Sequence, residues 1–447
     1  MSQYLPQTDH DVRAMLEAIG VQSLEALFED VPEECRFPGL DLPRAVSEME
    51  ILTELHGLAD KNSSTACFDT FIGAGAYNHF VPSAVSSLAG RGEFLTAYTP
   101  YQPEVSQGTL QAIYEYQSMI AELTGMEVVN ASHYDGATSM AEAAIMSYNV
   151  SRGKRNKIIV SPGVHPQYRE VLRTYLPGGE LQVTGDQDLS ASLEDLTILL
   201  DDQTACLIVQ NPDFFGELRE LGELADAVHT AGALLVVVAN PILSLGMFKP
   251  PGEYGADIVV AEGQPLGAGL NYGGPYLGVF AATMKNVRKM PGRLVGETVD
   301  TDGRRGYVLT LSPREQHIRR EKATSNICTN QGLIALTAGM YLAYMGRQGI
   351  RAVAELCYHK AHYAAREIDK LDKYRLISEG SFFNEFVVEC PKPVAELNQE
   401  LLEEGILGGY DLGSDYPERV NQMLVCVTEM NNRDQIDHLA NRLAAFG

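Results

Sequence analysis

Basic residues are scarce in this sequence of 447 residues, and the shortage limits the partners that the chain can bind. Lysine and arginine together number 34 against 59 aspartates and glutamates, which gives a formal net charge of −25. A negative field of that size opposes association with the phosphate backbone of nucleic acids and with anionic lipid. We therefore expect neither nucleic acid nor a membrane surface as a partner.

Long apolar runs and a targeting leader are also missing. No run of about 18 apolar residues, the length that a membrane-spanning helix needs, occurs in the chain. The start, MSQYLPQTDHD, has no basic segment followed by an apolar one. We expect a soluble, cytoplasmic protein.

Paired cysteines are absent as well. An odd number of scattered cysteines, none in a C-x-x-C pair, favours buried free thiols over a disulfide framework or a zinc site. We therefore expect no metal site. The seven are Cys35, Cys67, Cys206, Cys328, Cys357, Cys390 and Cys426.

Several common enzyme motifs are missing too. The chain has no P-loop, no H-E-x-x-H and no G-x-S-x-G. The glycine pairs at 73–75 and 267–269 lack the third glycine of the dinucleotide fingerprint, because Asn78 and Tyr272 stand at that position. A nicotinamide-dependent dehydrogenase is therefore disfavoured.

What is present indicates an α/β protein. Short, continuous apolar runs alternate with helical stretches, a pattern typical of a parallel sheet covered on both faces. We expect a helical arm at 1–60, in which Gly20 ends the first helix, and a large α/β domain at 61–300. The runs are KIIVSP (157–162), ACLIVQNP (205–212), ALLVVVAN (233–240) and ADIVVAEG (256–263).

A smaller α/β domain is expected at the C-terminal end. After a passage rich in glycine and proline at 291–306, the pattern predicts a long helix at about 327–344 and a second at about 350–372. Strands at 385–389 and 423–428 and helices at 394–404 and 433–445 follow. We assign 301–447 to the interdomain helix and this smaller domain.

Two segments carry functional groups. In YTPYQPE (98–104), prolines stiffen a loop that presents Tyr98, Thr99, Tyr101 and Gln102. On the residues alone, an ordinary structural turn explains this loop as well.

The second segment is basic. Arg314, His317, Arg319, Arg320 and Lys322 place five potential cations within nine residues of an acidic chain. They lead toward the predicted long helix, where free backbone N–H groups favour an anion. Capping residues, Thr324, Ser325 and Asn326, stand at its expected start. The alternative is an ordinary capped helix with a solvated basic turn.

Several stretches resemble the P-protein family of the glycine cleavage system, the pyridoxal-phosphate glycine decarboxylases, and specifically their N-terminal half or separate first subunit. The two longest are YTPYQPEVSQG (98–108) and REQHIRREKATSNICT (314–329). Shorter ones are IGAGAYNHFVP (72–82), NAS (130–132), QNPDFFG (210–216), YGGP (272–275) and GRLVG (292–296).

The resemblance implies a fold-type-I pyridoxal-phosphate-transferase architecture: a doubly wound, mostly parallel sheet with a smaller C-terminal α/β domain. It also implies a lysine before the Gly-Gly-Pro loop and an aspartate on an earlier strand. The lysine forms the resting Schiff base and the aspartate keeps the pyridine nitrogen protonated. Here Gln264 stands at the lysine position and Val237 at the aspartate position, and no lysine occurs between Lys249 and Lys285.

A chain without these two residues is expected to bind no pyridoxal phosphate in its own fold site. The resemblance implies a lysine-bearing second subunit that holds the cofactor, an α2β2 assembly, and transfer of the aminomethyl group of glycine to the lipoyl group of H-protein. It further implies that Tyr98, Thr99, Tyr101 and Gln102, with residues 324–326, line a site shared with that partner.

Two other functions remain open on the sequence. The chain could be a non-catalytic scaffold that only completes the dimer and docks H-protein. A self-sufficient pyridoxal-phosphate enzyme, with its lysine elsewhere in the fold, is disfavoured by the lysine-free window.

Overall fold

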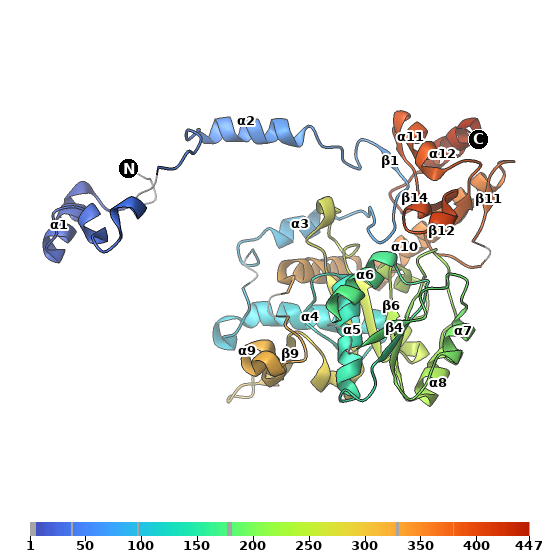
Figure 1. Cartoon of the computed structure of the whole chain (residues 1–447), viewed down its shortest axis with the longest axis horizontal. Coiled ribbons are helices and arrows are strands. Elements are labelled where there is room, and N and C mark those ends of the chain that lie inside the picture. Colours follow the sequence, from blue (N-terminus) through green and yellow to red (C-terminus); the bar gives the residue numbers. More distant parts are fainter. Residues whose placement is uncertain are drawn as a thin grey trace. The chain divides into compact units, whose positions relative to one another are not determined.

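The structure is a computed structural model that describes residues 6–36, 39–95, 98–176, 181–327, 330–378 and 380–446. The chain divides into two compact units, Met1–Ser63 and Ser64–Gly447. Each unit is described by itself (Figure 1).

The first unit is an arm of two capped helices. Helix α1 (Asp9–Ile19) starts in a capping box between Thr8 and Asp11, and Gly20 ends it in the left-handed conformation, as the sequence predicts. Helix α2 (Glu48–Ala59) has a similar box at Ser47. Neither helix buries a residue. On α2, exposed apolar side chains are Met49, Ile51, Leu52, Leu55 and Leu58.

The second unit is built on a seven-stranded sheet in the order β2-β8-β7-β6-β5-β3-β4. Strands β3 to β7 are parallel, and β8 is antiparallel to both of its neighbours. The bounds are β2 Val128–Val129, β3 Lys157–Val160, β4 Gln182–Thr184, β5 Thr204–Gln210, β6 Leu234–Val238, β7 Ile258–Glu262 and β8 Gly278–Ala282.

Both faces of this sheet are buried, which explains why its strands read as unbroken apolar runs. Helices α5 (Gly136–Val150) and α6 (Pro166–Tyr175) pack with one face in one core cluster. On the other face lies a second cluster, with residues of α3 (Ser83–Ala89), α4 (Gln107–Thr124), α7 (Leu193–Ile198), α8 (Gly222–Thr230) and α10 (Gly332–Asp369). Figure 1 shows α5 and α6 in front of the sheet.

The passage at 291–306, which is rich in glycine and proline, includes regular structure that the sequence pattern did not predict. It contains β9 (Leu294–Val299), which pairs antiparallel with β10 (Arg305–Thr310). Only the first residues of β9 are buried, so the hairpin lacks the continuous apolar pattern that reveals the central strands.

The predicted helix start at residue 327 is wrong. Helix α10 begins at Gly332 and runs to Asp369, with a kink at Gly346, where φ is 60°. That kink lies in the gap predicted between the two helices. Before α10 come two short turns, α9 (Gln316–Arg319) and a 3₁₀ turn at Arg320–Lys322.

The C-terminal part forms a four-stranded antiparallel sheet in the order β11-β12-β15-β14. Its bounds are β11 Arg375–Leu376, β12 Glu385–Glu389, β14 Tyr410–Asp411 and β15 Gln422–Cys426, with helices α11 Val394–Glu403 and α12 Arg433–Phe446. Strand β13 (Ile406–Leu407) pairs instead with β1 (Asp69–Thr70). This sheet and its helices share a core cluster of their own, to which Phe71 also belongs.

Four of the cysteines, at 206, 357, 390 and 426, are buried free thiols, as predicted. The prediction is wrong for Cys35 and Cys67, which are exposed. Cys328 lies outside the described residues. Among the helices that the structure describes, none is long and apolar enough to cross a membrane.

Candidate functional site

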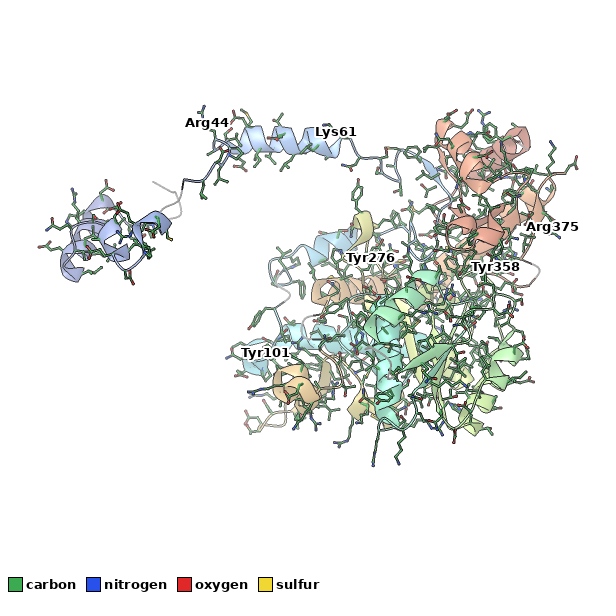
Figure 2. The ribbon with its side chains drawn as sticks, in the orientation of Figure 1. Arg44, Lys61, Tyr101, Tyr276, Tyr358 and Arg375 are labelled. Carbon is green, nitrogen blue, oxygen red and sulfur yellow. The ribbon has the colours of Figure 1, made fainter. Side chains whose placement is uncertain are left out.

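The carboxyl ends of the parallel strands open into a cleft of about 410 Å³. This is where open α/β sheets bind their ligands. Glu262 ends β7 and Asp135 precedes α5, and both line the cleft. The remaining lining includes His165, Tyr168 and Tyr276; Figure 2 labels Tyr276.

Gln264 follows β7 and is almost fully buried. Its Oε1 accepts a hydrogen bond from the Tyr77 backbone N–H at 3.1 Å, and its Nε2 donates to the carbonyls of Tyr77 at 3.0 Å and Ala268 at 2.9 Å. The amide therefore joins the loop after β7 to the segment around Tyr77. An amide nitrogen cannot form the imine that a lysine forms with an aldehyde.

Val237 is fully buried in β6, opposite Val209 of β5 and Val259 of β7. All three belong to the same apolar core cluster. Strand β6 reads Leu-Leu-Val-Val-Val and so offers no carboxylate. Nothing on this strand could hold a proton on a pyridine nitrogen.

The start of α5 already holds carboxylates of the chain itself. Asp135 caps the helix by accepting from the Thr138 N–H at 2.8 Å, and Glu262 Oε2 accepts from the Gly136 N–H at 3.0 Å. Glu262 Oε1 accepts from the backbone N–H groups of Gln264 and Leu277. Burial raises the pKa of Glu262 to about 7. A phosphate does not fit at this helix start, because the Gly136 and Thr138 N–H groups already donate to carboxylates of the chain and those neighbours are acidic.

The loop at 98–102 lies elsewhere on the second unit, at the end that carries α9 and β9 (Figures 1 and 2). Tyr98 is 78% exposed and Tyr101 44% exposed. Tyr101 places its ring edge against His317, with centroids 5.7 Å apart. Tyr98 and Thr99 line a narrow pocket together with Arg293.

Arg293 is a candidate site residue that was not singled out from the sequence. It is 5% exposed, donates from Nη2 to the Tyr101 hydroxyl at 2.9 Å, and has Nε 3.6 Å from Glu315 Oε2. Its Nε and Nη1 have no hydrogen-bond partner. Buried donors are rarely left unpaired, so this arginine is suited to an anionic group of a ligand. The only sign of this residue in the sequence was its position in the GRLVG stretch at 292–296.

Residues 324–326 do not start the long helix. The prediction that they cap it and hold an anion at its free N–H groups is therefore wrong. Helix α10 has Gln331 at its N-cap and no side-chain cap. Ser325 instead donates to Glu142 Oε1 of α5 at 2.8 Å and accepts from the Ile327 N–H. A residue of capping type is thus engaged by a partner far away in the sequence. Asn326 is exposed.

Thr324 nevertheless lies in a cationic environment. It lines a cleft of about 330 Å³ together with Arg288, Lys289, Arg314, Arg319 and Lys322. Within the described part of the chain, none of these five cations forms an ion pair. Arg314 donates to the carbonyls of Met290 and Gly292. The cleft can therefore attract an anion through side-chain charge alone.

Four of the seven predicted site residues thus fall into two groups. Tyr98, Thr99 and Tyr101 gather around Arg293, and Thr324 lines the cationic cleft. Glu315 links the groups, since it lies between Arg293 and the turn that carries His317. Gln102 is exposed and lines neither pocket.

Glu142, the partner of Ser325, is expected to make stability depend on pH. Burial raises its pKa from 4.5 to about 7, although the bond from Ser325 acts in the opposite direction. The folded state therefore holds this proton more tightly than the unfolded state. The protonated Glu142 side chain therefore contributes its full stabilisation of the fold below pH 4.5. That stabilisation is lost as the pH rises through 7.

Between pH 4.5 and pH 8 the unfolding free energy of the unchanged chain should fall as Glu142 loses its proton. In Glu142→Gln this fall should be smaller by about 3 kcal/mol. Urea unfolding at several pH values measures this, with Glu297→Gln, at an exposed carboxylate, as the control. Parallel pH profiles for the Glu142 variant and the unchanged chain would contradict the assignment.

Comparison with known proteins shows which family the chain belongs to. The profile described as "Glycine cleavage system P-protein" matches residues 2–443. A protein of Thermomicrobium roseum named "Probable glycine dehydrogenase (decarboxylating) subunit 1" is 55% identical over 443 residues, 98% of each chain. A protein with the same name from Bacillus cytotoxicus is 50% identical over 449 residues, 100% of each chain.

Solved structures agree. A crystal structure of glycine decarboxylase (P-protein) of the glycine cleavage system, in inhibitor-bound form, has a TM-score of 0.90 and 44% identity, covering 99% of this chain and 100% of that one. A sphingosine-1-phosphate lyase of Burkholderia pseudomallei, at 15% identity, has a TM-score of 0.66 over 93% of this chain and 94% of that one, which shows the fold alone. The predicted fold-type-I class is confirmed.

Proposed function

The chain belongs to the family of glycine cleavage system P-proteins, and from that membership we propose that it is the cofactor-free first subunit of a two-chain glycine decarboxylase. The observation that carries the proposal is Gln264, a buried amide hydrogen-bonded where a cofactor lysine is expected. The relatives named "subunit 1" match it over 98% and 100% of their length, and that name implies a second chain.

In this proposal the lysine-bearing second subunit binds pyridoxal phosphate, which supplies the electron sink for loss of CO2 from glycine. The aminomethyl group then passes to the lipoyl disulfide of H-protein. The present chain holds no cofactor, because Gln264, Val237 and the carboxylates at α5 do not suit one. We place the assembly, an α2β2 complex, in the cytoplasm.

The chain's contribution to the partner's site comes from the Tyr98–Gln102 loop, Arg293 and the cationic cleft. Arg293 offers unpaired buried donors, and Tyr101 fixes its fork through a 2.9 Å hydrogen bond. These groups are suited to orienting the carboxylate or phosphate of bound molecules without taking part in bond making. Thr324 and its five cationic neighbours hold a second anionic group. Ser325 and Asn326 support the segment that carries Thr324.

Helix α2 provides the contact with the partner. Its exposed apolar side chains would be costly to leave in water, since burying each contributes roughly 1.5–3 kcal/mol. We expect Leu52→Glu combined with Leu55→Glu to weaken association with the second subunit by roughly 100-fold or more. Light scattering and calorimetric titration of the two purified chains measure this.

Glu54→Ala, on the same exposed helix, is the matched control and should associate normally. The unfolding temperature of the second unit should not change in either variant. Undiminished association of the double variant would remove α2 from the interface.

The second candidate function is a scaffold subunit that has no influence on the chemistry. The observation that favours it is the exposure of Tyr98 on this chain. Tyr98→Phe, Tyr101→Phe and Thr324→Ala, each tested in the assembled complex, separate the two. Unchanged turnover with intact assembly would establish the scaffold. A loss of turnover with intact assembly supports the shared site.

The proposal as a whole is tested by reconstitution. The purified chain is mixed with its lysine-bearing partner and H-protein, and glycine–bicarbonate exchange is followed. We expect exchange to rise steeply and to saturate at an equal molar ratio of the two chains. If the chains neither associate nor raise exchange above that of the partner alone, the proposed function is wrong.

A further inference from the structure

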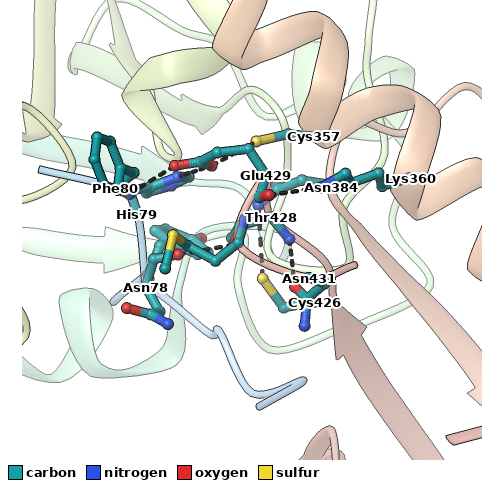
Figure 3. Close-up of polar contacts among 12 residues, drawn as sticks. Asn78, His79, Phe80, Cys357, Lys360, Asn384, Cys426, Thr428, Glu429 and Asn431 are labelled. Carbon is teal, nitrogen blue, oxygen red and sulfur yellow. Dashed lines mark hydrogen bonds and ion pairs between the residues drawn. The ribbon is translucent and has the colours of Figure 1, made fainter. Parts of the chain in front are cut away.

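Three potential metal ligands from distant parts of the sequence meet inside the second unit (Figure 3). His79 follows β1, Cys357 lies in α10, and Glu429 follows β15. Glu429 Oε2 is 2.7 Å from His79 Nδ1 and 3.3 Å from Cys357 Sγ. Potential ligand atoms of all three residues lie within 4.8 Å of one another.

The cluster is well shielded from water. Cys357 is fully buried, and the side chains of His79 and Glu429 are 1% and 8% exposed. His79 Nε2 is buried without a hydrogen-bond partner. Water therefore competes little for these ligands.

Neighbouring groups hold the ligands in place. The Phe80 N–H donates to Glu429 Oε1 at 2.7 Å, which leaves Oε2 directed at the other two ligands. Lys360 Nζ donates to the Glu429 carbonyl at 2.5 Å, and Figure 3 shows it beside the cluster. Such surrounding hydrogen bonds orient metal ligands and strengthen binding.

We propose that His79, Cys357 and Glu429 form a binding site for one divalent transition-metal ion of the zinc type. A set of one thiolate, one imidazole and one carboxylate matches the ligand preferences of zinc. Three protein ligands leave the fourth position of a tetrahedral ion open. The sequence did not reveal the site because 350 and 72 positions separate its members, whereas zinc motifs are recognised from short spacings.

The present contacts are those of the metal-free, hydrogen-bonded form. Zinc bonds of about 2.0–2.3 Å place tetrahedral ligand atoms roughly 3.3–3.6 Å apart, so the imidazole and carboxylate need to separate by less than about 1 Å. On binding, Cys357 loses its thiol proton to solvent. The proton on His79 Nδ1 is released and Nε2 takes one up, so that one proton leaves for each ion bound.

The site would join the start of the second unit to α10 and to the C-terminal sheet. Binding to the folded state alone raises stability by mass action. The metal is therefore expected to raise the unfolding temperature of the full chain. This inference does not depend on the proposed function, because its ligands lie outside the three pockets described above.

Cobalt(II) titration of the metal-free full chain tests the proposal. We expect one cobalt ion per chain, a thiolate-to-cobalt charge-transfer band in the near ultraviolet, and visible bands of tetrahedral intensity. In Cys357→Ser the band should disappear, and the affinity should fall by more than the roughly 10- to 100-fold that loss of an outer hydrogen bond costs. Competition between zinc and cobalt gives the zinc affinity.

Cys390→Ser is the matched control, since Cys390 is another buried thiol of the same unit outside the cluster. It should keep the band and the affinity. His79→Gln gives an independent variant if Cys357→Ser misfolds, as judged by circular dichroism. The proposal is overturned if the unchanged chain binds no cobalt, or if Cys357→Ser and Cys390→Ser behave alike.

Discussion

Arg293→Met is expected to lower kcat/KM of the reconstituted enzyme by about 100- to 1,000-fold, the usual effect of removing a charged donor from an anionic group in an active site. Arg293 is buried, has two unpaired donor atoms, and is positioned by Tyr101. Its removal leaves the anion of the bound molecule without a partner. The visible spectrum of the second subunit should stay unchanged, because the proposed function places the cofactor on that subunit.

Glycine–bicarbonate exchange measures the effect, and two variants interpret it. Arg304→Met changes an exposed arginine beside β10 and should leave kcat/KM unchanged. Arg293→Lys keeps the charge but not the planar fork, so partial recovery is expected. If Arg293→Met assembles normally and loses less than about threefold, Arg293 has no role in the shared site.

Gln264→Lys is the second change with a large expected effect, and it should not create a cofactor site. The new ammonium would be buried, the acceptor for the Tyr77 N–H would be lost, and Val237 would still offer no carboxylate. Burying an unpaired charge costs several kcal/mol. We expect no retained cofactor and an unfolding midpoint well below that of the unchanged chain.

Gln264→Met separates the two causes, because it removes the same hydrogen bonds without adding a charge. It should be destabilised less than Gln264→Lys. Decarboxylation of glycine by the isolated Gln264→Lys chain would contradict the account of the degenerate site. So would a variant as stable as the unchanged chain.

The sequence predicted the central sheet to within two residues at each strand end that it named. Strands β5, β6 and β7 are buried on both faces, and burial of that kind leaves a continuous apolar run that can be read locally. The end of the N-terminal helix was equally legible, because Gly20 forms its C-cap.

Features that depend on distant contacts were not legible. Ser325 looked like a helix cap, but Glu142, 183 positions away, accepts its hydrogen bond. The environment of Arg293 depends on Tyr101, 192 positions away, so its burial leaves no local pattern. The hairpin β9–β10 is half exposed and therefore lacks the continuous apolar run from which the central strands were predicted. For Ser325 and Arg293 the deciding partner comes from tertiary structure.

The central claim, that this chain supplies a shared site but holds no cofactor, is tested most directly by borohydride reduction. The chain is incubated with pyridoxal phosphate, alone and with its partner, then desalted, reduced and digested for mass spectrometry. We predict no retained imine absorbance for the isolated chain and, in the complex, a labelled lysine only on the partner. A reduced, labelled lysine on this chain, with absorbance retained before reduction, would contradict the claim.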